Sequence, residues 1–311
     1  MNTTTNTTET ISIHNLTFGI ELETTGLSRE ASAAAIAAAI PGSHVGYNGR
    51  TVVLADGREW KAVSDGSISG WVNAEVVSPV CTTADMDMVQ TVVRALRAAG
   101  AKVDDSTGIH IHVGVAHLKV RAIVNLIHLV ARFEGIVGKS IEQLDRRASF
   151  YSKPTNPVLL ASVRKVPSTM ESLRTRWYAA AGTDGTSHYD SSRYHNLNLH
   201  SMFCSSPSHN HGTAEFRCFN GSLHAGKVRA YILLSLSMVA RAANSKSITR
   251  REFVYSPAAA KHQMSGFLRD CRMVGDYFAN PRKHLIETLP GTSNSYEAGR
   301  LMGTSRVRTA A

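Results

Sequence analysis

Alternating apolar and polar positions predict several short β-strands in this chain. The first begins near residue 16, where Phe18, Ile20 and Leu22 alternate with Glu21 and Glu23. Residues two apart in a strand point to the same face, so the two glutamates lie together while the apolar side chains face a core. Adjacent carboxylates repel each other and lose hydration when buried, so this strand predicts a cation or strong hydrogen-bond donors between them.

The same alternation recurs in four later segments that carry polar side chains suited to a charged site. These segments contain Glu75, the pair His110 and His112, the pair Asn196 and Asn198, and the pair Glu215 and Arg217. Each is short and has apolar residues between or beside the polar ones, as in half-buried strands. We expect these strands to turn their polar faces toward one site.

Helical spacing of apolar residues separates the strands. Helices are expected at 28–40 with Ser28 as N-cap, 82–100, 119–147, 170–181, 227–243 and 258–278. Asp56-Gly57 predicts a hairpin over 51–63, because this dipeptide supplies the positive φ angles of a tight turn. Strands are expected at 194–203 and 213–219, and the polar stretch 182–192 is typical of a flexible loop or lid.

The order of these elements predicts the fold class. Strands come first, a long helix follows, and two paired strands come after it, which is not the regular alternation of a doubly wound parallel sheet. We therefore expect an α+β fold with a mainly antiparallel sheet flanked by helices. We expect a flexible N-terminus over 1–15, a main domain over 16–245, a helical extension of it over 246–290, and a disordered tail over 291–311.

Composition narrows the class of protein. The chain has 311 residues, 43% hydrophobic and 19% charged, which is ordinary for a globular protein. No apolar run is long enough to cross a bilayer, and the Thr-rich start lacks the features of a signal peptide, so a cytoplasmic protein without membrane association is expected. The four cysteines are scattered and form no CxxC pair, which favours reduced, structural thiols.

Charge is distributed unevenly along the chain. The net charge is +10, and the region from Arg241 onward has 12 Lys and Arg against 5 Asp and Glu. A basic surface attracts anionic ligands such as ATP or nucleic acid. No aromatic residues interleave with these charges, so a solvated helical surface is favoured and nucleic acid is not an expected partner.

The residue types on the polar faces point to chemistry on charged oxygens. Carboxylates favour Mg²⁺ or Mn²⁺, whereas imidazole also admits Zn²⁺. Phosphoryl transfer fits best, because metal ions would bridge phosphates and the planar guanidinium of Arg217 matches phosphate oxygens.

Other interpretations remain open at this level. A metal-dependent hydrolase could use His110, His112 and Glu75 around one zinc ion. A nucleotide-binding protein without turnover would carry the same residues. Each motif is weak alone: Glu215 and Arg217 could form a structural ion pair, and the polar residues Asn196, Asn198 and His200 could satisfy nearby backbone groups.

Taken together, the motifs resemble those of the amidoligase family, which belongs to the carboxylate–amine ligases related to glutamine synthetase and glutamate–cysteine ligase. The resemblance covers about 16–243. The motifs are, in order, Phe-Gly-Ile-Glu-Leu-Glu ending at Glu23, Asp65-Gly-Ser, Glu75-Val-Val-Ser-Pro, Gly-Ile-His-Ile-His-Val around His110, Leu-Asn-Leu around Asn198, and Thr-Ala-Glu-Phe-Arg-Cys-Phe-Asn-Gly around Glu215.

This resemblance implies a fold and a reaction. The fold would be glutamine synthetase-like, with antiparallel strands forming a funnel-shaped active site and 16–245 as the catalytic domain. The reaction would form an amide or isopeptide bond through an acyl phosphate, with ATP and Mg²⁺ or Mn²⁺ as cofactors. The partners would be a carboxylate substrate, for which a glutamyl group is the first choice, and a small amine or amino acid. Oligomeric state is left open.

The resemblance also implies individual roles. One metal ion would be shared by Glu21, His110 and Glu215, and the other by Glu23 and Glu75. Cofactor binding would involve His112, Arg217, Asn196 and Asn198, with His112 near the ATP phosphates. Catalysis would involve Arg217 on the transferring phosphoryl group, together with Glu75 and Asp65, and Asp65 or Asn196 would lie near the substrate. No amino-acid-binding loop and no third acid for the second metal site can be matched.

Overall fold

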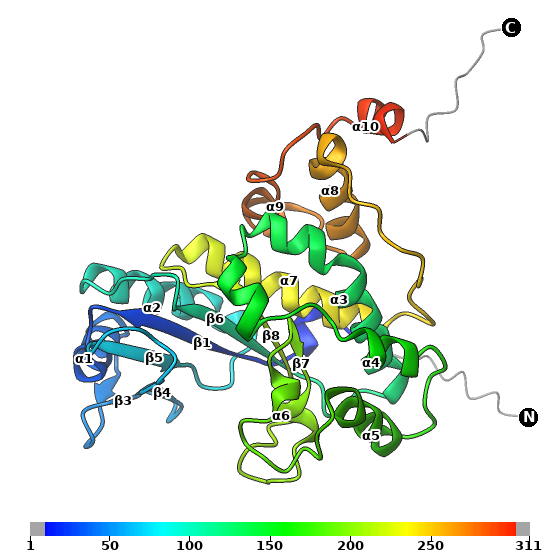
Figure 1. Cartoon of the computed structure of the whole chain (residues 1–311). Helices are drawn as coiled ribbons and strands as arrows, with labels where there is room; N and C mark the ends of the chain where they lie inside the picture. The colour runs from blue at the N-terminus through cyan, green and yellow to red at the C-terminus, as the bar shows by residue number, and fades with distance from the viewer. Residues whose placement is uncertain (1–9, 303–311) are drawn as a thin grey trace, which may run out of the picture.

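An eight-stranded antiparallel sheet forms the centre of the protein (Figure 1). The computed structural model describes residues 10–302. The strand order is β2-β3-β4-β5-β1-β6-β8-β7. The strands are β1 (Phe18–Thr25), β2 (His44–Val45), β3 (Thr51–Val53), β4 (Glu59–Val63), β5 (Asn73–Val77), β6 (Gly108–Gly114), β7 (Leu197–Asn198) and β8 (Thr213–Asn220). The predicted combination of helices with an antiparallel sheet is confirmed, and the sheet is open.

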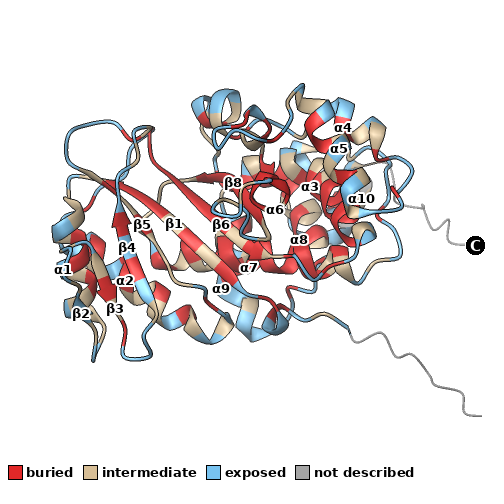
Figure 2. Ribbon diagram, turned by 90° about the horizontal axis from the view of Figure 1, so that it is seen from below, coloured by how far each residue is buried: buried red, intermediate tan, exposed pale blue. Residues whose placement is uncertain are grey.

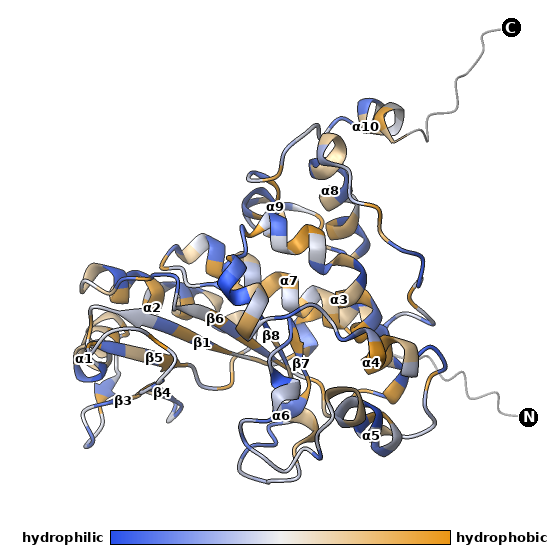
Figure 3. Ribbon diagram, viewed as in Figure 1, coloured by the Kyte–Doolittle hydropathy of each residue, from blue (hydrophilic) through white to orange (hydrophobic). Residues whose placement is uncertain are grey.

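Helices cover one face of this sheet. They include α1 (Arg29–Ala39), α2 (Met86–Ala98), α3 (Val120–Ser140) and α7 (Ala225–Ala243). Two further helices, α8 (Ala260–Asp270) and α9 (Ala279–Ile286), pack on α3 and α7. Helix α7 contacts β6, α2, α3 and α9, and it is buried along most of its length. Figure 3 shows hydrophobic stretches along α3 and α7, and apolar residues of both helices belong to the buried core. Figure 2 views the molecule from below, turned by 90° from Figure 1, and there the central strands lie in front of α2 and α7.

Local sequence signals explain where these elements begin and which face they bury. The hydroxyl of Ser28 accepts a hydrogen bond from the Ala31 amide at 3.1 Å and caps α1, as expected. Helix α2 buries one stripe of apolar residues, namely Met86, Val89, Val92, Val93 and Leu96. In β1, the alternate residues Phe18, Ile20 and Leu22 are buried, so the polar residues between them face the other side of the sheet.

The helix expected over 119–147 ends earlier. Helix α3 stops at Ser140, and Glu142 adopts a left-handed backbone conformation with φ of 54°. A separate π-helical turn follows at Arg147–Tyr151. This change of direction carries Arg147 away from the axis of α3 and toward the sheet.

The strand expected over 194–203 is also shorter. Only Leu197–Asn198 pairs with β8, and His200–Phe203 forms the short helix α6. The His200 amide donates a hydrogen bond to Asn198 Oδ1 at 2.7 Å, and this side-chain acceptor stabilises a turn in place of further strand pairing. Two more helices, α4 (Pro157–Ser162) and α5 (Met170–Ala181), precede this region, and α5 matches its expected range.

The chain ends differ from the expected flexible segments. Helix α10 (Ser295–Leu301) forms within the tail expected to be disordered, and the Thr292 amide donates to the Ala258 carbonyl at 3.0 Å. Ala298 is fully buried, so packing overrides the polar composition of this stretch. Near the start, Ile13–Asn15 forms a 3₁₀ turn capped by Ser12. The rest of the two expected segments, 1–9 and 303–311, lies outside the described residues.

Two simpler expectations can be compared with the structure. All four cysteines, Cys81, Cys204, Cys218 and Cys271, are buried and form no disulfide. Within residues 10–302, no helix combines the length and apolar character needed to cross a membrane.

Candidate metal and catalytic site

Strand register brings the polar side chains together on the sheet face opposite α7. Glu21 of β1 lies directly across from His110 of β6, and Glu23 lies across from Glu75 of β5. On the other side of β6, Glu215 of β8 is the partner of both His112 and Asn198. Side chains directly opposite each other on antiparallel strands are close enough to interact, so five strands contribute to one charged cluster.

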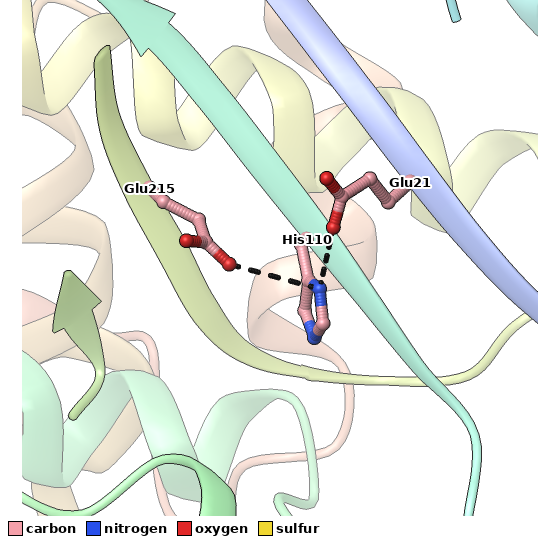
Figure 4. Close-up of side chains that lie close together, drawn as sticks. All are labelled: Glu21, His110 and Glu215. Carbon is pink, nitrogen blue, oxygen red and sulfur yellow. Dashed lines mark hydrogen bonds and ion pairs between the residues drawn. The ribbon is translucent and has the colours of Figure 1, made fainter. Parts of the chain in front are cut away.

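Glu21, His110 and Glu215 form the most compact part of this cluster (Figure 4). One candidate ligand atom from each lies within 4.8 Å of the others. His110 Nδ1 is 2.8 Å from Glu21 Oε2 and 3.7 Å from Glu215 Oε1. Two carboxylates and an imidazole at this spacing could hold a divalent cation.

Glu215 is held by two further side chains. Arg217 Nη1 donates to Glu215 Oε1, and Asn198 Nδ2 donates to Oε2 at 2.5 Å. Burial alone would favour the neutral carboxyl, but Arg217 and the two histidines lower the pKa of Glu215 to about 2. The carboxylate is therefore charged and oriented, as a metal ligand requires.

Charges within the cluster also act on Glu21 and His112. Burial opposes ionisation of both, yet each stabilises the charged form of the other, with His112 Nε2 3.1 Å from Glu21 Oε1. The pKa of Glu21 is held well below its usual range, and the pKa of His112 is raised by Glu21 and Glu215. The Glu21 side chain is 24% exposed whereas that of Glu215 is 3% exposed, so solvent reaches the cluster from the Glu21 side.

Glu75 belongs to a second group of acids with Glu21, Glu23 and Asp65. Burial raises the pKa of Glu75 to about 10, and the negative charges of Glu21, Asp65 and Glu23 add to this shift. Backbone amides help the other two acids, because Gly108 donates to Glu23 at 2.5 Å and Ser67 donates to Asp65 at 2.7 Å. These amide donors carry no net charge, so the negative charges of Glu21, Asp65 and Glu23 still act on Glu75.

Arg147 is a member of the cluster that the sequence did not reveal. Its Nη2 donates to the Arg217 carbonyl at 3.0 Å and lies 3.3 Å from His110 Nε2, while Nη1 is 3.9 Å from Glu23 Oε2. Strand alternation in the sequence could not mark Arg147, because this residue follows a helix and begins a π-helical turn. Gly108 makes room for it, since a Cβ there would lie 2.0 Å from Arg147 Nη1.

Two expected polar residues lie outside the cluster. Asn196 accepts hydrogen bonds from Ser152 and Gln143 and donates to Glu134, so its side chain holds neighbouring segments together. His200 contacts Tyr178, with its Nδ1 2.9 Å from the phenolic oxygen. Because β7 has only two residues, the alternation that places Asn198 at the site does not extend to either.

A zinc hydrolase would use His110, His112 and Glu75, but the structure brings a different group of ligands together. Among residues 10–302, the candidate ligand group is Glu21, His110 and Glu215, whereas Glu75 is associated with the other acids. The roles of all these residues as metal ligands or catalytic groups stay predictions.

The fold and the site together define a mixed helix-and-sheet protein with a carboxylate–imidazole–guanidinium cluster on its open sheet face. A model of the family described as "Putative amidoligase enzyme" matches residues 14–239, and the chain belongs to this family. The expected family resemblance is confirmed.

Comparison with solved structures includes a bifunctional glutathione synthetase from Pasteurella multocida. The two are 11% identical in sequence, and the superposition has a TM-score of 0.46. It covers 94% of this chain and 49% of the synthetase, so the chain spans about half the length of that protein. No curated protein matches the sequence.

Proposed function

We propose that this protein is an ATP-dependent carboxylate–amine ligase that forms an amide or isopeptide bond through an acyl phosphate. The observation that carries the proposal is the cluster of Glu21, His110 and Glu215 beside Arg217, in a chain of the amidoligase family. A glutamine synthetase-like arrangement of the catalytic strands, and a glutamyl group as the acid, are parts of the same proposal.

The donor set fits divalent cations. Glu21, His110 and Glu215 would hold one ion, and Glu23 and Glu75 would hold a second. Carboxylate oxygens suit Mg²⁺ or Mn²⁺ and one imidazole is compatible with either. The raised pKa of Glu75 supports this fit, because burial and the negative charges of Glu21, Asp65 and Glu23 all disfavour its ionised form and a bound cation would offset them. The metal ions would neutralise negative charge on the phosphates of bound ATP.

The side chains of the protein would then position the reacting groups. Glu215 fixes the guanidinium of Arg217, which suits the transferring phosphoryl group because its planar donors match phosphate oxygens. Asn198 orients Glu215 from the other side, and His112, with its raised pKa, would lie near the phosphates. Asp65, only partly buried at the edge of the acid group, would lie near the amine.

The proposed reaction has two balanced steps. A carboxylate oxygen of the substrate would attack the γ-phosphorus and ADP would leave, giving the acyl phosphate. The amine would then attack the acyl carbon, phosphate would leave with the electron pair of the broken C–O bond, and the amine would lose a proton. The cluster would therefore serve charge stabilisation in the first step and acyl transfer in the second.

Amine-dependent ADP release tests this proposal. The purified chain is incubated with Mg²⁺-ATP and panels of acids, amino acids and polyamines, alongside Glu21→Gln and His110→Gln. Glu59→Gln serves as a matched control, because Glu59 is an exposed acid on the neighbouring strand β4 and lies outside the cluster. We expect ADP only when acid and amine are both present, and loss of release in both site variants. Nucleotide-dependent stabilisation with no product from any pair would indicate a nucleotide-binding protein instead.

A further inference from the structure

A cavity of about 660 Å³ lies against α3, separate from the cluster on the sheet. Its wall on α3 is the stripe His128, Arg132, Gly135 and Lys139, which follows helical spacing along one side. Other α3 residues, including Val130 and Val137, face the β8 residues Phe216 and Cys218. Helix α3 therefore stands between this cavity and the sheet.

Two other segments complete the cavity. Residues from Pro154 to Arg164, including α4, form one wall, and residues from Thr249 to Tyr255 form another. Figure 1 shows the second segment passing beside α3, after α7 and before α8. This segment belongs to the basic C-terminal region whose charge the proposed ligase reaction does not use.

Five cationic side chains line the cavity, and they are Arg132, Lys139, Arg164, Arg250 and Arg251. Within residues 10–302, none of the five makes an ion pair with a carboxylate. The two acids in the lining are Glu134 and Glu252. The oxygens of Glu134 accept hydrogen bonds from Thr155 and Asn196, and Glu134 forms an ion pair with none of the five cations.

Among the five cationic residues, Arg132 gives the most specific evidence for a bound anion. Its Nη1 is buried and has no hydrogen-bond partner among the described residues. A buried donor without an acceptor is costly, and a guanidinium is seldom left in this state. An anionic ligand in the cavity would supply the missing acceptor. Arg250 reaches the same region, because its charge adds to burial in lowering the pKa of His128.

The shape of the cavity favours a compact ligand over a nucleic acid strand. The cations surround a hollow of the size typical of small-molecule sites and do not form an extended stripe. Its aromatic residues are already used, because Phe253 packs on Phe133 with ring centroids 5.2 Å apart and Lys139 Nζ lies 5.0 Å from the Tyr255 ring. Both rings are partly buried, so the lining has few aromatic faces on which successive bases could stack.

We propose that this cavity binds a small polyanion with two or more phosphate groups, at a site distinct from the sheet cluster. Several guanidinium groups from different segments can engage separate phosphates, because each presents planar donors that match phosphate oxygens. The proposal does not depend on the ligase reaction.

Isothermal titration calorimetry with inorganic tripolyphosphate tests this site. The full chain is used with a chelator and no added metal, so that the acidic sheet cluster repels the probe. The test variants are Arg132→Gln and the exposed pair Arg250→Gln/Arg251→Gln. The matched control is Arg94→Gln/Arg97→Gln, which removes the same charge from the exposed side of α2.

We expect saturable binding to the wild type, at least tenfold weaker binding to each test variant and unchanged binding to the control pair. If Arg132→Gln fails to fold, the exposed pair still decides the result. Absence of saturable binding, or equal weakening in the control pair, would overturn the proposal. Tighter binding of a single-stranded oligonucleotide than of tripolyphosphate, weakened by the same two variants, would assign the surface to nucleic acid instead.

Discussion

Glu23 and Glu75 lie directly across from each other on β1 and β5, so two carboxylates share one cross-strand position at the centre of the sheet. Like charges at such a position destabilise a sheet. The protein retains the pair where Glu21 and Asp65 add further negative charge. A cation between the two carboxylates, as proposed for the second metal ion, would offset this repulsion.

Glu75→Gln is expected to stabilise the metal-free protein at pH 8. The pKa of Glu75 is about 10 in the folded protein, against an ordinary value of 4.5. Between these values the unfolded chain ionises while the folded chain holds the proton, so the stability contribution falls as pH rises. Glutamine removes this dependence. Thermal melts in chelator from pH 5 to pH 9 should show the variant gaining most at the alkaline end.

Added Mg²⁺ should reverse the order of stability of the wild type and Glu75→Gln. The wild type should gain melting temperature with millimolar Mg²⁺, whereas Glu75→Gln should gain less because one ligand charge is lost. The exposed Glu59→Gln variant on β4 should respond as the wild type does. A wild-type protein whose melting temperature ignores both Mg²⁺ and Mn²⁺ would contradict the two-metal arrangement.

Glu215→Gln is expected to destabilise the protein at neutral pH by about 3–5 kcal/mol, because it leaves the buried Arg217 without its charge partner. The pKa of Glu215 is about 2, below its ordinary 4.5. The stabilisation is therefore present above about pH 4.5 and is lost as pH falls toward 2. Urea unfolding at pH 7 and pH 3 should show a smaller difference between wild type and variant at pH 3.

Arg217→Ala should lower the chemical step about a hundredfold or more while Mg²⁺-ATP binding is largely kept, as for loss of a transition-state charge partner. Arg217→Lys keeps the charge but not the planar donors, and it should recover only part of the rate. Single-turnover ADP formation separates this effect from nucleotide affinity, with circular dichroism as the folding control. Equal losses of affinity and rate would place Arg217 in ground-state binding.

Gly108→Ala tests the position of Arg147. The new Cβ would lie 2.0 Å from Arg147 Nη1, so the guanidinium must move away from His110 and Glu23. We expect a loss of about 1–3 kcal/mol in unfolding free energy, together with lower activity. Gly266→Ala on α8 is the matched control, since nothing lies within 4 Å there and alanine favours a helix. Equal stability of the two variants would contradict the packing described for Arg147.

Truncation after Leu289 should leave ADP release with small amines unchanged but lower the melting temperature. It removes the buried Ala298 and the hydrogen bond from Thr292 to Ala258, both of which attach this segment to the domain. These contacts lie far along the chain from the cluster residues of β1, β5, β6 and β8. A large loss of activity at a temperature where the truncated protein stays folded would show that the segment contributes to the site.

Much of the local structure was determined by the sequence itself. Side-chain direction in a strand depends only on the alternation of neighbours, so Glu21 and Glu23 could be assigned to one face before any partner strand was known. Capping is similarly local, and Ser28 begins α1 as expected. The ordered motifs also identified the family, because residues that share chemistry recur in a fixed order along the chain.

Tertiary structure decided which of these residues meet. Register across β1, β5, β6 and β8 depends on pairing between segments far apart in sequence, and it sets Glu21 opposite His110 and Glu23 opposite Glu75. Arg147 enters the cluster only because the chain leaves the line of α3 after Ser140. Asn196 is turned to Glu134 because β7 begins only at Leu197, so the strand alternation does not include Asn196. Such outcomes depend on non-local packing, which local alternation and capping do not encode.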